Sequence, residues 1–505
     1  MTSAPPTAAD QLSAVHDRRR WIALAIVMMA SFMDLVDVTI VNVAIPSIQD
    51  HLGASFSAIQ WVTAGYALAF AIGLITGGRL GDIYGRKRVF LIGIGGFTVA
   101  SALCGLAVDP GMLVATRILQ GATAALMVPQ VLSIIHTSFP AHERGKVFGM
   151  FGAMVGLGAV SGPLLGALLT EWNLGGLEWR PIFLINLPVG VAGLLLGRRF
   201  IDESRAARSL RLDLVGMALA ALGLLMLLYP LTQGRDSGWP LWGFVSMGLS
   251  LPTLALFVRY ERFKARKDGS PLVELSLFKV RSFAGGIGVQ LVFGVTCGIF
   301  FLVWTLWMQI GLGWSPLRAG TTGVPFSIAV SAAAGISVQQ LVPRFGRKVL
   351  QAGALVMATG VLLYLWEAHR YGTAIHSWQM ALPLVVMGLG MGLIVAPLTD
   401  AVLAEVPREH AGSASGLINT TQQLGNALGL GLVSVAFFGV VDGAAPGRTV
   451  GAVFTQAFSH SLWWLVGCLL MVFLLMFALP NRRPATAEPI EEGKAEADRE
   501  PLPVG

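Results

Sequence analysis

The feature that most constrains this chain is a series of apolar runs that recur from end to end, each long enough to cross a membrane. A transmembrane helix needs about 20 consecutive apolar residues. Of the 505 residues, 54% are hydrophobic and only 12% are charged, whereas about 25% is usual in soluble proteins. This composition argues against a soluble enzyme, a nucleic-acid-binding protein and a disordered scaffold.

Fourteen runs have the length of a membrane span, and they are far longer than strands. Only helices and closed barrels satisfy the backbone in lipid, so the sequence predicts an all-α integral membrane protein with 14 transmembrane helices. We place the spans near 21–46, 58–78, 89–107, 111–136, 147–169, 181–197, 213–231, 240–258, 283–310, 317–340, 349–367, 379–400, 414–440 and 458–479.

The basic residues predict the orientation of these helices. With an even number of spans, 29 of the 35 Lys and Arg residues fall on the side of both termini, five fall on the other side, and Arg117 lies within a span. Cytoplasmic loops carry the excess of Lys and Arg. We therefore expect a multi-pass protein of the plasma (inner) membrane with both termini in the cytoplasm, and we attribute the net charge of +7 to topology.

An internal repeat divides the chain. Four glycines, at 145, 149, 158 and 162, recur at 412, 416, 425 and 429, and Tyr84–Lys87 recurs as Phe345–Lys348. Two such halves are a transporter architecture with the substrate at their interface. We expect a cytoplasmic N-terminal segment (1–20), an N-terminal six-helix bundle (21–200), two inserted helices with linkers (201–282), a C-terminal six-helix bundle (283–480) and a disordered cytoplasmic tail (481–505).

Four motifs carry a resemblance to a known family over about 20–480. They begin at Gly78 (GRLGDIYGRKR), at Arg117 (RILQG), at Gly149 (Gly-x8-Gly-x3-Gly-Pro-x2-Gly) and at Asp37 (DVTIVNVAIP). They are similar to motifs of the major facilitator superfamily, and with 14 helices the chain resembles its EmrB/QacA-type drug:proton antiporters. The final glycine of the third motif is Ala167 here.

The resemblance implies the major facilitator fold and proton-coupled efflux of amphipathic or hydrophobic organic compounds by alternating access. The alternative is a dedicated exporter of one endogenous metabolite, such as an antibiotic, lipid or siderophore, and a remote alternative is a non-transporting membrane sensor. We find no catalytic or phosphate-binding motif, so we expect no enzyme and no cofactor, with the proton gradient as energy source. Expected partners are the substrate, protons and lipids, with no nucleic acid and no obligate protein partner.

Three charged residues are expected deep in the bilayer, and we assign them to proton coupling: Asp34, Asp37 and Arg117. Such charges need partners or a wet cavity. Asp34 and Asp37 share one helix face, and like charges favour protonation of one of them. We expect Asp37, which lies in the family motif, to be the main proton site. The alternative is a structural ion pair without proton transfer.

The loop motif is expected to latch the two halves together through Gly78, Asp82, Gly85, Arg86 and Lys87. Gly85 permits a tight turn, while Arg86 and Lys87 anchor the loop at the membrane face. Asp82 is expected at the N-terminus of the helix that begins near Gly412, where a helix dipole stabilises a carboxylate. The alternative is that the motif serves only as a topology signal.

Glycines of the fifth span are expected to form an antiporter gate, because glycine allows close helix packing and proline bends a helix. The alternative is tight packing alone. The expected gate residues are Gly149, Gly158, Gly162, Pro163 and Gly166.

The substrate cavity is expected among polar and aromatic residues in or near the spans, each of which has packing or the membrane interface as its alternative. The tenth span has no acidic residue, which argues against strong selectivity for divalent cationic drugs, and Asp400 and Glu405 are interpreted as loop residues. The candidates are Asn42, Gln60, Trp61, Tyr66, Gln120, Gln290, Trp304, Gln309, Asn419 and Gln423.

Overall fold

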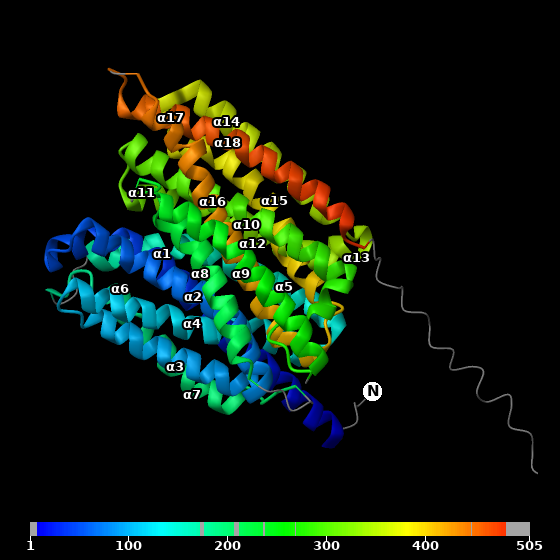
Figure 1. Cartoon of the computed structure of the whole chain (residues 1–505). Helices are drawn as coiled ribbons and strands as arrows, with labels where there is room; N and C mark the ends of the chain where they lie inside the picture. Colours follow the sequence, from blue (N-terminus) through cyan, green and yellow to red (C-terminus); the bar gives the residue numbers. More distant parts are fainter. Residues whose placement is uncertain are drawn as a thin grey trace, which may run out of the picture.

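The predicted all-α class is confirmed by the computed structural model (Figure 1). The described part of the chain comprises residues 8–171, 176–206, 212–235, 238–267, 269–445 and 447–480, and it contains no strand. Within it, 13 helices are long and apolar enough to cross a membrane. The remaining predicted span falls in another long helix, α5, of 31 residues, so every predicted span is helical.

The first six spans pack together as one bundle, drawn in blue and cyan in Figure 1. The first helix begins at Ala8 in the described residues, so the predicted N-terminal segment is helical from that residue onward. Two consecutive helices, α6 and α7, share the sixth span. The helices are α1 (Ala8–Leu52), α2 (Phe56–Tyr84), α3 (Arg86–Gly105), α4 (Pro110–Ser138), α5 (Ala141–Glu171), α6 (Pro181–Leu184) and α7 (Asn186–Phe200).

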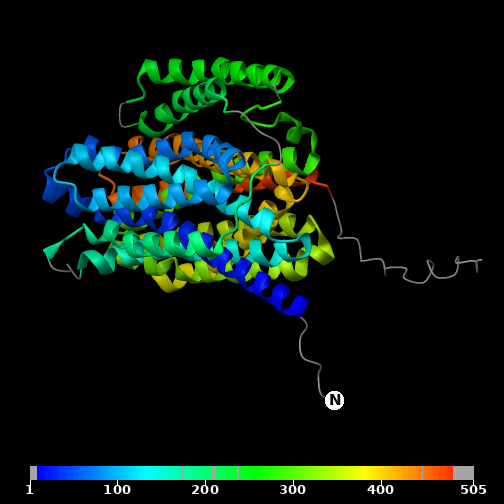
Figure 2. The same ribbon diagram turned by 90° about the horizontal axis from the view of Figure 1, so that it is seen from below.

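The inserted pair, α8 (Leu214–Gln233) and α9 (Leu241–Lys267), lies along one edge of the molecule, as Figure 2 shows. α8 packs against both α2 of the first bundle and α16 of the second. α9 exposes large apolar side chains such as Trp242 and Phe244, as expected of a lipid-facing helix. The pair therefore covers a seam between the two bundles.

The last six spans form the second bundle, with short turns of other helix types at several ends. The helices are α10 (Arg281–Leu306), α11 (Pro316–Thr322), α12 (Val324–Ile336), α13 (Val342–Phe345), α14 (Lys348–Tyr371), α15 (Ser377–Leu403), α16 (Ala411–Ala436), α17 (Phe438–Asp442) and α18 (Val450–Leu475). The short turns are η2 (Leu275–Lys279), η3 (Trp307–Gly311), η4 (Ser337–Leu341), η5 (Gly372–Ala374), η6 (Arg408–His410) and η7 (Met476–Ala478). The predicted tail, 481–505, lies outside the described residues.

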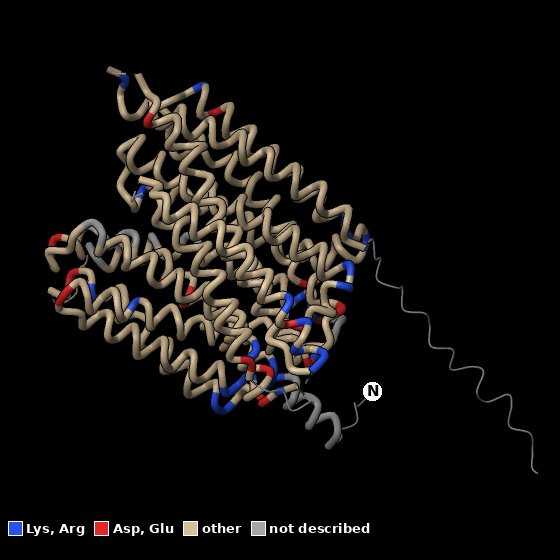
Figure 3. The backbone as a smooth tube through the Cα atoms, in the orientation of Figure 1, with Lys and Arg blue, Asp and Glu red and all other residues tan. Residues whose placement is uncertain are grey.

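The two bundles meet mainly along two helix pairs, α5 with α12 and α2 with α16. Lys and Arg residues gather at one end of the molecule, at the lower right of Figure 3. We call this the basic end; it holds the turn between α2 and α3 and the start of α16. The asymmetry agrees with the predicted distribution of basic loops.

Candidate functional site

A buried ion pair joins Asp37 of α1 to Arg117 of α4. Arg117 Nη1 donates to Asp37 Oδ2 at 2.6 Å, and the side chains are 0% and 1% exposed. Asp37 Oδ1 accepts hydrogen bonds from Gln120 Nε2 and Asn186 Nδ2, each at 2.8 Å. Both carboxylate oxygens of Asp37 therefore have donors, which come from two helices, α4 and α7.

α2 fixes the other side of the guanidinium of Arg117. Arg117 Nε donates to the carbonyl oxygen of Val62 at 3.1 Å, and the central carbon of the guanidinium lies 4.3 Å from the centre of the Tyr66 ring. A cation over an aromatic face gains further stabilisation. The ion pair thus holds α1, α2, α4 and α7 together.

The second carboxylate, Asp34, has different surroundings. It is 6% exposed and accepts a hydrogen bond from the hydroxyl of Tyr66. Among the described residues no Lys, Arg or His forms an ion pair with Asp34, whereas Arg117 is paired with Asp37. The two predicted proton-coupling carboxylates are therefore not equivalent.

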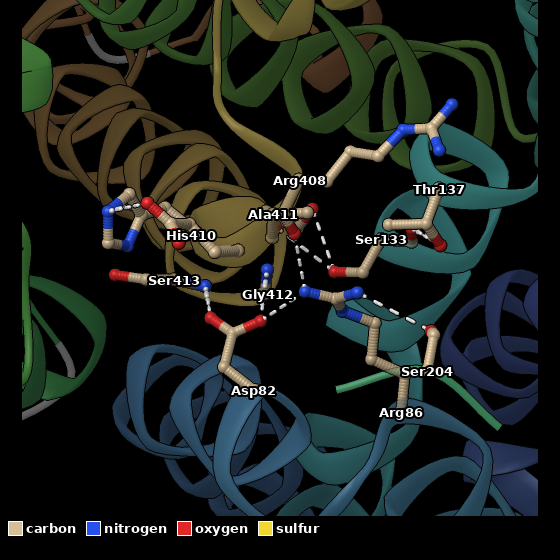
Figure 4. A network of polar contacts seen from close by, with 12 residues as sticks. Asp82, Arg86, Ser133, Thr137, Ser204, Arg408, His410, Ala411, Gly412 and Ser413 are labelled. Carbon is tan, nitrogen blue, oxygen red and sulfur yellow. Dashed lines mark hydrogen bonds and ion pairs between the residues drawn. The ribbon is translucent and has the colours of Figure 1, made fainter. Parts of the chain in front are cut away.

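The loop motif reaches the second bundle where the sequence placed it (Figure 4). Asp82 is 1% exposed, and its Oδ1 and Oδ2 accept from the backbone nitrogens of Gly412 and Ser413 at 3.0 and 2.8 Å. These nitrogens belong to the first turn of α16, where the positive end of the helix dipole favours an anion. Gly78 lies beside this contact, since a Cβ there would fall 2.2 Å from the carbonyl oxygen of Gly412.

The expectation that Arg86 anchors the loop at the membrane face is wrong, because this side chain is only 1% exposed. Its Nη2 donates to Asp82 Oδ1 and to the carbonyl oxygen of Arg408, both at 2.7 Å (Figure 4). Lys87 remains at the surface and donates to the carbonyl oxygen of Arg198 at 2.8 Å. Gly85 has φ +105°, a conformation that L side chains rarely adopt. Arg86 therefore belongs to the contact between bundles.

Two residues of α4 extend this contact, and sequence reasoning missed both. Ser133 Oγ donates to the carbonyl oxygen of Ala411 at 3.1 Å, and His136 Nε2 lies 2.9 Å from the carbonyl oxygen of Val406. A serine or histidine within an apolar run gives no sequence signal of such a role. Together with Asp82 they close the basic end between the bundles.

A further hydrogen bond between the bundles lies away from the basic end. It runs from Ser331 Oγ to the carbonyl oxygen of Ala153, at 2.9 Å and midway along α5. The described structure is therefore closed at the basic end.

The predicted gate glycines of α5 face two different partners. A Cβ on Gly149 would lie 3.2 Å from the carbonyl oxygen of Ala334 in α12, whereas Gly158 and Gly162 face Leu35 and Thr39 in α1. Gly149 thus contacts the second bundle, and the other two pack within their own. Gly166 is buried in α5, and the side chain of Pro163 lies outside the described residues.

The glycines of α16 repeat this division. Gly412 and Gly416 approach α2 of the first bundle, while Gly425 and Gly429 approach α10 of their own. The repeated glycines therefore place equivalent helices in equivalent contacts. Gly152 and Gly156 also face α12 and were missed, because they lie outside the repeated pattern.

Polar side chains of α10 and α16 bond to one another in the second bundle. Gln290 Nε2 donates to Gln422 Oε1, and Asn426 Nδ2 donates to Gln423 Oε1 at 3.1 Å. Asn419 Nδ2 donates to the carbonyl oxygen of Ser415 at 2.9 Å. These side chains are half-buried, so Gln290, Asn419 and Gln423 form one polar region.

The other predicted cavity residues separate. Tyr66 and Gln120 belong to the central charged cluster. Trp61 is half-buried and stacks on Tyr229 of α8 at 5.7 Å between ring centres. Trp304 is wrongly assigned to a cavity, because it is buried and its Nε1 donates to Tyr364 Oη at 2.7 Å.

The last three predicted cavity residues belong to none of these groups. Gln60 is half-buried and Gln309 is exposed, while the side chain of Asn42 lies outside the described residues. The interpretation of Asp400 as a loop residue is wrong, because it lies in the last turns of α15; Glu405 does lie in the turn that follows.

Comparisons with known proteins place this geometry in a family. A family model described as Major Facilitator Superfamily matches residues 27–430. The chain is 44% identical over 440 residues to a probable actinorhodin transporter of Streptomyces coelicolor, covering 85% of this chain and 76% of that protein. It is 34% identical over 491 residues to the puromycin resistance protein pur8 of Streptomyces alboniger, covering 95% and 94%.

A third relative is the cephamycin export protein CmcT of Amycolatopsis lactamdurans, 36% identical over 416 residues, covering 81% and 84%. Among solved structures, the proton:xylose symporter XylE matches with a TM-score of 0.64 at 18% identity, covering 92% of this chain and 97% of that one. The human organic anion transporter MFSD10 matches with a TM-score of 0.63 at 16% identity, covering 90% and 99%. These structural likenesses show the fold.

Proposed function

The chain belongs to the Major Facilitator Superfamily, and we propose that it exports amphipathic or hydrophobic organic compounds, such as drugs or antibiotics, in exchange for protons. The observation that carries the proposal is the pair of carboxylates at the centre of the first bundle, of which only Asp37 is paired with a cation. Relatives named for puromycin resistance and cephamycin export support the direction of transport. The proton gradient is the energy source, without a cofactor.

Asp34 is the carboxyl group that exchanges the proton in this proposal. Asp37 is already satisfied by Arg117, Gln120 and Asn186. Among the described residues, the hydroxyl of Tyr66 is the hydrogen-bond donor to the side chain of Asp34, and that ring lies against the guanidinium of Arg117. A change in the charge of Asp34 therefore acts on Arg117 through Tyr66. The motif favoured Asp37 as the main proton site, and the proposal assigns this role to Asp34 instead.

The substrate binds between the bundles, on the polar region of Gln290, Asn419 and Gln423 in the second bundle. Amide groups on a largely apolar surface orient amphipathic ligands without demanding a fixed charge. The first bundle handles protons from the opposite side of the same interface. Alternating access then moves this interface between the two sides of the membrane.

The contact of Asp82 with α16 latches the basic end in this cycle. It needs the first turn of α16 within hydrogen-bond distance, so it is lost when the bundles separate at that end. We place the basic end in the cytoplasm, with both termini there, and the protein in the plasma membrane. The described structure is then closed to the cytoplasm, and of the predicted gate residues Gly149 faces the α5–α12 seam.

A dedicated exporter of one metabolite is the second candidate function. It is favoured by relatives named for single compounds, a probable actinorhodin transporter and a cephamycin export protein. Both candidate functions use the same proton exchange and differ in how many compounds are exported. Transport assays with a panel of cationic dyes and antibiotics distinguish them, because a dedicated exporter should accept few of these compounds.

The experiment uses proteoliposomes that contain the purified protein and an internal pH dye. An imposed proton gradient should drive substrate movement, and substrate added without a gradient should move protons. The Asp34→Asn variant should bind substrate without moving protons. Proton movement that persists at the wild-type rate in this variant would contradict the proposed role of Asp34. If no compound of the panel moves protons in the wild type, antiport itself is contradicted.

A further inference from the structure

A second cluster of buried charges lies at the basic end, apart from the central ion pair. It consists of Arg79 of α2, Asp213, which caps the N-terminus of α8, and Glu261 of α9. Their side chains are 2%, 1% and 0% exposed. We call these three residues the insert cluster, because they join the inserted pair to the first bundle.

Each member of the insert cluster has a buried polar atom without a hydrogen-bond partner: Arg79 Nε, Asp213 Oδ2 and Glu261 Oε1. The other carboxylate oxygens are held in place. Asp213 Oδ1 accepts from the backbone nitrogen of Gly216 at 2.9 Å, and Glu261 Oε2 accepts from the backbone nitrogen of Val273 at 3.0 Å. Buried polar groups are normally satisfied in native proteins, so the two free oxygens point to a missing hydrogen.

The free oxygens face the same small space. A Cβ on Gly216 would lie 2.4 Å from Glu261 Oε1 and 2.8 Å from Asp213 Oδ2. Two buried carboxylates that face one small space repel when both are ionised, which favours protonation of one of them. With Arg79 counted, one proton also makes the insert cluster neutral.

The other charged groups near the insert cluster leave this balance unchanged. The charge of Asp82 interacts with Arg79, but Asp82 is itself paired with Arg86. The charge of Glu274 also interacts with Arg79, from a half-buried position. The charge of Lys264 interacts with Tyr260, whose hydroxyl donates to Asp213 Oδ1 at 3.2 Å. Tyr260 is half-buried, so its hydroxyl lies between the surface and the carboxyl pair.

We propose that Asp213 and Glu261 form a second proton-binding site, which adjusts the opening of the basic end to the pH on that side. The site lies at the end of the molecule that holds the Asp82 latch, and it is separate from Asp34. When the proton is present, Asp213 and Glu261 do not repel each other, and α8 and α9 stay packed together. When it leaves, the two carboxylates repel each other.

A short backbone segment connects this site to the latch. Glu261 holds the backbone nitrogen of Val273, and the carbonyl oxygen of Leu272 accepts from Ser413 Oγ at 3.2 Å. Ser413 in turn donates its backbone nitrogen to Asp82 at 2.8 Å. α8 also packs on both α2 and α16. Loss of the proton therefore loosens the contact that closes the basic end.

The first test is an infrared pH titration of the full-length protein in lipid nanodiscs, which follows the absorption of protonated carboxyl groups. The wild type should show a titrating carboxyl signal that is lost in both Glu261→Gln and Asp213→Asn. The matched control Glu274→Gln, at the cap of the neighbouring turn η2, should keep it. A signal that survives both variants, or that disappears only in Asp34→Asn, overturns the proposal.

The second test measures the distance across the basic end between spin labels, as a function of pH. The open population should rise with pH in the wild type and in Glu274→Gln, and it should be independent of pH in Glu261→Gln. If Glu261→Gln does not fold, Asp213→Asn carries the same test, because asparagine is also a good N-cap. A pH dependence that is unchanged in the variant that folds overturns the proposal.

These outcomes are distinct from those of the proposed transport function. Proton exchange at Asp34 is measured by transport, whereas the insert cluster is measured by its own carboxyl signal and by the conformational response. Glu261→Gln should still move protons with substrate at a fixed pH. Loss of proton movement in the wild type would contradict antiport and leave the result for the insert cluster standing.

Discussion

The two bundles share one framework but have different cores. In both, the early glycines of a long helix face the opposite bundle and the later ones face the bundle's own first helix, as with Gly149 and Gly158 in α5 and Gly416 and Gly425 in α16. The core of the first bundle contains the ion pair of Asp37 with Arg117. The repeat therefore preserved backbone contacts and not chemistry.

Aromatic rings occupy the core of the second bundle. Trp307 stacks on Phe458 with 4.2 Å between ring centres, and Trp304 bonds to Tyr364. Such packing involves no carboxylate, whereas the core of the first bundle holds carboxylates. The difference agrees with the proposal that the first bundle handles protons and the second contacts the substrate.

The equivalent turns differ in the same way. Asp82 corresponds in the repeat to Pro343, which has no side-chain oxygen to accept from a helix N-terminus. Arg347, the counterpart of Arg86, instead donates to the carbonyl oxygens of Phe477 and Leu479 in its own bundle. The turn between α2 and α3 therefore carries a charged latch that its counterpart in the repeat lacks.

The largest effect that would test this difference is expected from Asp37→Asn. It leaves Arg117 buried without its anion, and breaking a buried ion pair costs about 3–5 kcal/mol. Thermal unfolding of the purified protein should show a marked loss of stability, with loss of efflux. The matched variant Asp400→Asn in the second bundle should unfold like the wild type. Equal stability of the two variants would contradict the structural role of the ion pair.

Asp34→Asn should separate stability from proton coupling. The asparagine oxygen can still accept from Tyr66, so the unfolding temperature should stay near that of the wild type. Substrate exchange between the two sides should continue, while efflux driven by a proton gradient should fall to the level of empty liposomes. Efflux that still follows the imposed gradient would show that Asp34 does not carry the proton.

Gly78→Ala should open the basic end by separating α2 from α16. Its Cβ would lie 2.2 Å from the carbonyl oxygen of Gly412, which is backbone and cannot rotate away. Gly288→Ala is the matched control in a membrane helix of the second bundle, since nothing lies within 4 Å of its Cβ. Cysteine accessibility at the basic end should rise in the first variant alone, and equal accessibility would contradict close packing at this seam.

Asp82→Asn should give the smallest change, because the asparagine oxygen can still accept a backbone bond and Arg86 keeps its bond to the carbonyl oxygen of Arg408. An anion at a helix N-terminus contributes about 0.3–1 kcal/mol, and about 2 when partly buried, so the open population should rise about 2- to 30-fold. Pro343→Ala, at the equivalent position of the repeat, should leave it unchanged. Spin-label distances across the basic end measure both. A shift of the same size in both variants would show that the latch is not specific to Asp82.

The sequence was sufficient for the helices because a span is defined by its own apolar run. It also brought Asp37 near Arg117 and Asp82 near Gly412, since these residues lie in motifs with known helix ends. It could not show that Asn186 and Gln120 hold Asp37, because such contacts depend on the lateral packing of helices. The burial of Arg86 and the meeting of Asp213 with Glu261 likewise depend on how separate segments pack.

The central claim is that the first bundle alone carries the transported proton, and one measurement tests it most directly. Proton movement per substrate should be recorded in proteoliposomes containing the wild type, Asp34→Asn or Asp400→Asn. Coupled movement is expected in the wild type and in Asp400→Asn, and none in Asp34→Asn. Coupled movement in Asp34→Asn together with its loss in Asp400→Asn would place the proton in the second bundle and contradict the account.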